Sequence, residues 1–142
     1  MASTLANNFL EQLLKKEIDF DTDTFKVILM ASGFVFDRDA HALYANVSAS
    51  ELATAYGYTV GGVTLSGVSV AQDDVNNAGT VSWSSASWNI SGGNITSSGA
   101  IIIDDTVSGD PIIGYIDFGG DQTCLNGGVA TIANPGIALT GV

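Results

Sequence analysis

The sequence contains little of the residue types from which most catalytic and metal sites are built. Its 142 residues include one cysteine, one histidine and four basic residues. Cys124 has no second cysteine with which to form an internal disulfide. A zinc site would need more His or Cys ligands than the chain contains. We therefore expect no metal and no cofactor in this protein.

Positive charge is equally scarce. Lys15, Lys16, Lys26 and Arg38 stand against 15 acidic residues, and the formal net charge is -11. Nucleic-acid binding depends on Lys and Arg that neutralise phosphates. Since all four basic residues lie within the first 40 positions, the rest of the chain cannot form a basic patch. We expect neither nucleic acid nor an anionic membrane as a partner.

Charge of either sign is sparse as well. Charged residues make up 13% of the chain, about half the usual share. Ser, Thr, Asn and Gly carry the polarity instead. Such a surface is weakly solvated and is readily buried against another subunit, which favours an oligomer or a component of a larger assembly.

Long hydrophobic runs are missing. The longest, Val27 to Ala31 and Ala100 to Ile103, are too short to span a bilayer. The N-terminal residues MASTLANNFLEQLLKK carry their lysines after the apolar stretch, which is unlike a secretory signal. We expect a chain made in a cytoplasm that does not cross a membrane.

One segment has the pattern of a helix. Apolar residues fall at helical spacing on one face between residues 4 and 17, and Ser3 or Thr4 can cap the start. The stripe consists of Leu5, Phe9, Leu10, Leu13 and Leu14. It must pack on the protein's own sheet, on a sibling subunit or on the surface of a larger assembly. We predict that it contributes the contact to an oligomer or to an assembly.

The rest of the chain has the pattern of a β protein. After a strand at Phe25 to Ala31, residues 36–52 predict a long loop with helical turns around 39–45. Short strands separated by Gly, Asn, Asp and Ser follow, and Val63 to Val70 breaks its alternation near Ser66 and Gly67. The predicted strands are Tyr58 to Val60, Val63 to Val70, Thr80 to Trp83, Trp88 to Ile90, Ala100 to Ile103, Ile112 to Phe118, Val129 to Ile132 and Ile137 to Leu139.

This spacing predicts a mainly β, single-domain protein, either a β-sandwich or a jelly-roll-like barrel, with one N-terminal α-helix. The helical segment occupies residues 1–20 and the β-sandwich residues 21–142.

Candidate chemistry is weak throughout. His41 lies near Asp37 and Asp39, but no nucleophile motif accompanies it. Residues 19–24 begin like a calcium loop, yet Thr24 stands where that loop needs Gly and Met30 where it needs Glu. We predict a structural His and a solvated turn.

Two acidic clusters at strand ends have more than one interpretation. One gathers Asp104, Asp105 and Asp110, and the other Asp117 and Asp121. Paired carboxylates can bind a cation or hydrolyse glycosides. Asp is also a common turn residue beside Gly and Ser, and that interpretation is favoured.

The aromatic residues also have two interpretations. A sugar-binding face could be lined by Trp83, Trp88, Tyr44, Tyr56, Tyr58 and Tyr115. Packing of both tryptophans in the core or against a neighbouring chain is favoured.

An ordered set of motifs resembles a family of small virion structural proteins of tailed bacteriophages. The segment FDTDTFKVILMASGFVFDRDAHALYANVSASELA is followed by GYTVGGVTLSGVSV, and the likeness covers most of the chain. The pieces that match are Asp21 to Leu29, Asp37 to His41, Gly57 to Gly67, Val81 to Trp88 and Ile112 to Gln122. The Gly/Ser-flanked stretch Ala100 to Asp105 departs from the longer charged segment typical of the family.

The resemblance implies a non-enzymatic capsid decoration (cement) protein that binds the major capsid protein on the outer capsid surface of the virion. It implies a homo-oligomer, with a trimer as the expected form. A carbohydrate- or receptor-binding module of a head fibre, neck or tail component stays open as the alternative, and an acid–base hydrolase is weaker.

Overall fold

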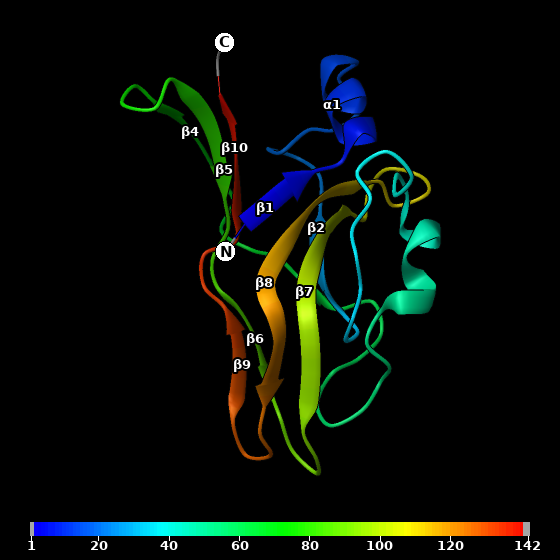
Figure 1. Cartoon of the computed structure of the whole chain (residues 1–142). Coiled ribbons are helices and arrows are strands. Elements are labelled where there is room, and N and C mark those ends of the chain that lie inside the picture. The colour runs from blue at the N-terminus through cyan, green and yellow to red at the C-terminus, as the bar shows by residue number, and fades with distance from the viewer. Residues whose placement is uncertain (1, 141–142) are drawn as a thin grey trace.

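A five-stranded antiparallel sheet forms one layer of the molecule. The structure is a computed structural model that describes residues 2–140. The sheet has the order β1-β8-β7-β2-β3, and Figure 1 shows its long central pair β7 and β8. Its strands are β1 (Ala2–Leu5), β2 (Phe25–Met30), β3 (Val63–Thr64), β7 (Ile95–Asp104) and β8 (Ile112–Cys124).

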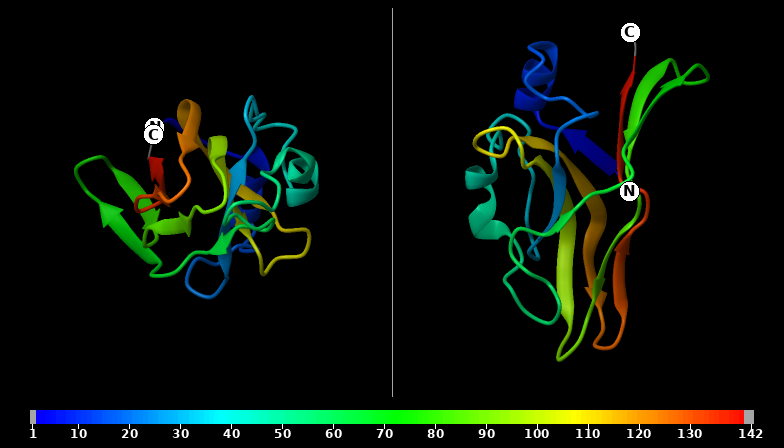
Figure 2. Two further views of the ribbon diagram at one scale, coloured as in Figure 1. Left: turned by 90° about the horizontal axis from the view of Figure 1, so that it is seen from below. Right: turned by 180° about the vertical axis from the view of Figure 1, so that it is seen from behind.

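A long bent ribbon forms the second layer. Its lower half in Figure 1 pairs β6 (Ala86–Asn89) with β9 (Val129–Ile132). Its upper half pairs β5 (Ala78–Ser82) with β10 (Gly136–Thr140). The ribbon bends between the halves, where the backbone N–H of Trp83 donates to Pro135. Strand β4 (Ser69–Asp73) joins the upper half beside β5. We call the three-stranded sheet β10-β5-β4 the arm, and Figures 1 and 2 show it projecting past the end of the first layer.

The central strands of the first layer are covered on both faces. In β2 the consecutive residues Val27, Ile28 and Leu29 are all buried, and so is the run Ala100 to Ile103 in β7. Because neighbouring side chains of a strand point to opposite faces, burial of consecutive residues requires cover on both sides. The ribbon and its two buried tryptophans join the same core cluster as the sheet. The prediction of a mainly β, sandwich-like fold with one α-helix is confirmed.

The helix is shorter than its predicted span of residues 4–17. Helix α1 covers Asn7–Leu14. The predicted caps Ser3 and Thr4 instead lie in β1, where they pair with Ile116 and Tyr115 of β8. The missing side chain of Gly114 admits this strand, since a Cβ there would approach the carbonyl oxygen of Thr4 to 2.9 Å. A long-range backbone pairing therefore replaces the local capping that the sequence favours.

Helix α1 ends in a Schellman arrangement. The N–H of Lys16 donates to Leu13 and the N–H of Glu17 to Gln12, with Lys16 at φ 60°. These two bonds satisfy carbonyls that would otherwise be left free at the helix end. The predicted last turn to residue 17 is thus a cap rather than a continuation of the helix.

Three further predictions need correction. Tyr58 to Val60 is no strand, since Tyr58 makes only an isolated bridge to Ala55. Val63 to Val70 is two strands, β3 and β4, and the break between them includes the predicted irregularity at Ser66 and Gly67. The helical turns expected around 39–45 are the short 3₁₀ segments η1 (Tyr44–Asn46) and η2 (Ser48–Ser50), slightly later in the chain.

We predict that Trp83→Ala lowers the free energy of unfolding by about 3–5 kcal/mol, the usual cost of truncating a buried aromatic side chain. Trp83 is 3% exposed and packs against both Phe20 and Phe25 at the bend of the ribbon. Denaturant unfolding provides the measurement. Val35→Ala, at a side chain that is 80% exposed, is the control and should change stability by less than about 0.5 kcal/mol. Equal effects of the two changes would contradict the assignment of Trp83 to the core.

Candidate functional site

The predicted contact stripe on α1 is divided between the core and the surface. Phe9 is fully buried in the protein's own core, so its side chain is not accessible to a partner. Leu5, Leu10 and Leu13 are half-buried against that core. Leu14 is 87% exposed. Of the five residues predicted to make an oligomer or capsid contact, Leu14 is thus the most available, and their role in a contact stays a prediction.

A groove runs beside the exposed end of this stripe. Its volume is about 490 Å³. Leu13 of α1, Ile18 and Phe20 of the following turn, and Val70 of the arm form its apolar lining. Lys16, Asp19 and Asp21 complete the lining with charge. The groove joins the C-terminal end of α1 to the arm.

The turn after α1 uses its carboxylates internally. Asp23 Oδ2 accepts the N–H of Asp19 at 2.8 Å, and Asp19 Oδ1 accepts the N–H of Asp21 at 2.9 Å. The second of these bonds is that of an Asx turn, and the first closes the turn from its far end. The calcium-like start at Asp19 to Thr24 therefore folds as a turn that leads into β2.

His41 lies in a comparable local turn. Its Nδ1 accepts the N–H of Asp37 at 3.1 Å. The imidazole stacks on Phe34, with ring centroids 5.5 Å apart. Asp37 Oδ1 in turn accepts the N–H groups of Asp39 and Ala40, and these bonds hold the pKa of Asp37 below its usual value. The arrangement fixes the loop and brings no nucleophile to the ring.

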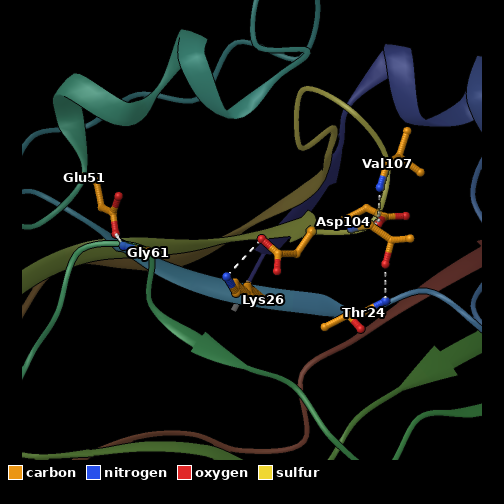
Figure 3. A network of polar contacts seen from close by, with 8 residues as sticks. Thr24, Lys26, Glu51, Gly61, Asp104 and Val107 are labelled. Carbon is orange, nitrogen blue, oxygen red and sulfur yellow. Dashed lines mark hydrogen bonds and ion pairs between the residues drawn. The ribbon is translucent and has the colours of Figure 1, made fainter.

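The first acidic cluster closes the loop after β7. Asp104 is fully buried, and its Oδ1 accepts the N–H groups of Thr106 at 2.8 Å and Val107 at 3.2 Å. Asp105 forms an ion pair with Lys26 at 2.9 Å (Figure 3). The N–H of Thr24 donates to Thr106 Oγ1, which ties this loop to the start of β2. Asp110 takes a positive φ in the same loop, as a turn residue does.

The second oxygen of Asp104 is in a different situation. Within residues 2–140, Oδ2 of Asp104 is buried and has no hydrogen-bond donor. The neighbouring carboxyl of Asp23 can share a hydrogen bond with it only when one of the two is protonated. Burial raises the pKa of Asp104 to about 6, and the Asp23 carboxyl adds to this rise against the two backbone N–H donors. The pair is suited to hold a proton.

The second acidic cluster lies along the exposed part of β8. Asp117 Oδ1 accepts the N–H of Gly119 at 2.8 Å, and Ser32 Oγ donates to Asp121. Asp117 thus supports the irregular strand locally, and Asp121 ties it to the turn after β2. Among residues 2–140, no three His, Cys, Asp or Glu side chains come together in a group that could hold a metal ion.

The aromatic residues do not form a binding face. Trp83 and Trp88 are 3% and 4% exposed, and Tyr58 and Tyr115 are buried with them. Trp88 packs against Tyr58, with ring centroids 5.9 Å apart. Of the six aromatic residues considered for a sugar-binding face, only Tyr44, which is half-buried, and Tyr56, which is exposed, reach the surface. The favoured prediction of core packing is confirmed for both tryptophans.

A buried carboxylate that the sequence analysis did not single out organises the long loop. Glu51 is 8% exposed, and its Oε1 accepts the hydroxyl of Tyr58 at 2.6 Å and the N–H of Gly61 at 2.7 Å (Figure 3). Its Oε2 accepts the hydroxyl of Tyr44. Burial and the hydrogen bond to Glu51 raise the pKa of Tyr44 to about 12. Burial also raises the pKa of Tyr58 well above its usual value. Both phenols therefore stay protonated donors at physiological pH.

A second groove lies between the layers. It measures about 510 Å³ and opens between β8 and β9, two strands that follow each other in sequence but pair with different partners. Trp88, Ile95 and Ile132 contribute apolar surface, and Gln122 and Thr131 contribute polar groups. Cys124 also lines it, half-exposed. None of the residues that line this groove is charged.

Comparison with known proteins adds no assignment: no family model, no curated protein and no solved structure matches this chain. Over residues 2–140, the one α-helix is too short to cross a bilayer. The arrangement of side chains is therefore the basis for any functional proposal. It offers apolar contact surface at α1 and the arm, and carboxylates that are occupied by the protein's own N–H groups.

We predict that Asp104→Asn stabilises the protein at pH 7.5 by on the order of 2 kcal/mol. The folded-state pKa of about 6 lies above the unfolded value near 3.8, so the folded state binds more protons between these values. Stability from this group is therefore present at low pH and is lost as pH rises from about 4 to above 6. The variant keeps the Oδ1 acceptor but cannot ionise.

Urea unfolding between pH 4 and pH 8 tests this expectation. The native protein should lose stability across that window, and Asp104→Asn should lose less. Asp105→Asn, which removes the partly exposed neighbour, is the matched control and should keep the native slope. Identical pH profiles for the native protein and Asp104→Asn would disprove the buried proton.

Proposed function

We propose that this chain is a non-enzymatic structural protein of a tailed-bacteriophage virion, a decoration (cement) protein that binds the major capsid protein on the outer surface of the head. The observation that carries the proposal is the exposed apolar end of α1. Leu14 is 87% exposed beside a groove lined by Leu13, Ile18 and Val70. The ordered motifs that resemble such virion proteins support it.

The proposed activity is binding alone. A protein that binds the assembled capsid and not its separated subunits stabilises the assembly by mass action. The contact needs apolar area rather than a reacting group. The carboxylates of the chain fit this role, since Asp19, Asp37 and Asp117 accept backbone N–H groups of their own loops.

The alternative, a carbohydrate- or receptor-binding module of a fibre, neck or tail, has less support. It rested on an aromatic face, and Trp83, Trp88, Tyr58 and Tyr115 are buried. We therefore retain the decoration role as the proposal, with synthesis in the host cytoplasm and assembly onto the virion.

We predict that Leu14→Asp weakens binding to empty capsids at least about tenfold. Full burial of a leucine is worth about 1.5–3 kcal/mol, and each 1.4 kcal/mol is tenfold in affinity. Co-sedimentation with capsids of the same virus is the measurement. Leu125→Asp is the control, because Leu125 is 64% exposed in the turn between β8 and β9, at the end of the molecule away from α1 (Figure 1).

Two results would contradict the proposal. One is a native protein that does not bind empty capsids. The other is equal capsid affinity for Leu14→Asp and the native protein. Phe9→Asp is unsuitable for this test, because Phe9 belongs to the core and its replacement would unfold the domain.

A further inference from the structure

The charges of this chain are distributed very unevenly between its two layers. Between residues 52 and 103 the only charged residues are Asp73 and Asp74, and residues 122–140 have none. These segments contain the whole arm and both strands of the β6–β9 sheet. The other 17 charged residues lie in residues 11–51 and 104–121. The ribbon layer is nearly free of charge.

Exposed apolar residues gather in the same layer. Of the nine large apolar side chains with high exposure, Val68, Val70, Val75, Leu125 and Val129 belong to its strands and turns. In the arm, Val70 is 55% and Val75 89% exposed. A three-stranded sheet needs cover on an apolar face to be stable. Within the arm, Ala78 and Val81 of β5 are buried and Ile137 and Leu139 of β10 are partly buried, whereas Val70 of β4 and Val75 of the adjoining turn remain uncovered.

The outer strand of the arm has an unprotected edge. β4 pairs with β5 on one side, and no strand among the described residues pairs with its other side. Residues 69–72 of β4 are all exposed and include no Lys, no Pro and no charge, and the only charge of the strand is Asp73 at its end. Proteins that stay monomeric usually protect such an edge with charge, proline or a bulge. This edge is therefore suited to pair with another strand.

From these three features we propose that the arm is the surface through which copies of this chain associate, with β4, Val70 and Val75 inside the contact. The partner is a second copy because of the charge. Two molecules of net charge -11 repel each other, and they approach at least cost through the layer that carries almost none of it. The contact includes Val70, which also lines the groove beside α1, but it does not include Leu14, and it requires no capsid.

Matched charge insertions test this surface in the full-length chain without capsids. Val75→Asp and Val70→Asp should convert the native oligomer to monomer in sedimentation velocity, with at least a tenfold rise in the dissociation constant. Val35→Asp is the control: it makes the same change at a valine that is 80% exposed in the charged part of the chain. It should leave the oligomer intact.

Hydrogen exchange of the native protein provides a second measurement that no misfolded variant can obscure. The amides of residues 69–73 should become more protected as protein concentration rises, while those around Val35 should not change. A native protein that is monomeric at every concentration would overturn the proposal. Dissociation by Val35→Asp as strong as by the arm variants, or an oligomer that neither arm variant affects, would also overturn it.

Discussion

Four aromatic side chains hold the elements of this protein together. Phe20 stacks on Phe25 with ring centroids 5.1 Å apart, and both contact Trp83, at 6.0 and 5.4 Å. Phe9 of α1 meets Phe20 edge-on at 6.0 Å. The four residues come from the helix, the turn, the first layer and the bend of the ribbon. Because aromatic pairs in such geometry add to the free energy of burial, the cluster fixes α1 and the arm relative to the sheet.

This constraint determines which surfaces remain free. The helix cannot present its whole apolar stripe, since Phe9 is committed to the cluster and only the far end at Leu14 is exposed. Trp83 holds the ribbon where it bends, so the arm beyond that point extends past the body (Figure 2). Val70 of the arm and Leu13, the neighbour of Leu14 on α1, consequently line one groove.

The sequence predicts the local patterns well and the long-range pairings poorly. The strand at Phe25 is predicted because consecutive apolar residues require burial, and burial of both tryptophans follows from their setting among short strands. The start of the helix is not predicted correctly, because Ser3 and Thr4 form β1 instead of a cap. The space for β1 beside β8 depends on the distant Gly114. Glu51 gives no local signal either, since its partners Tyr58 and Gly61 are brought to it by the course of a loop. The raised pKa of Asp104 comes mainly from its burial, with a smaller contribution from Asp23, about 80 residues earlier in the chain.

The hydrogen bonds and burial of the carboxylates explain why this acidic chain offers few reactive carboxylates to partners. Asp19, Asp37 and Asp117 have their oxygens bound to nearby N–H groups, and Asp104 is buried. A carboxylate held in this way shapes a loop and is poorly placed to act on a substrate. What the surface has in excess is apolar side chains in a region with almost no charge. A contact made through such a surface would draw its free energy from the apolar area that it buries, which is consistent with the proposed association and needs no reacting group.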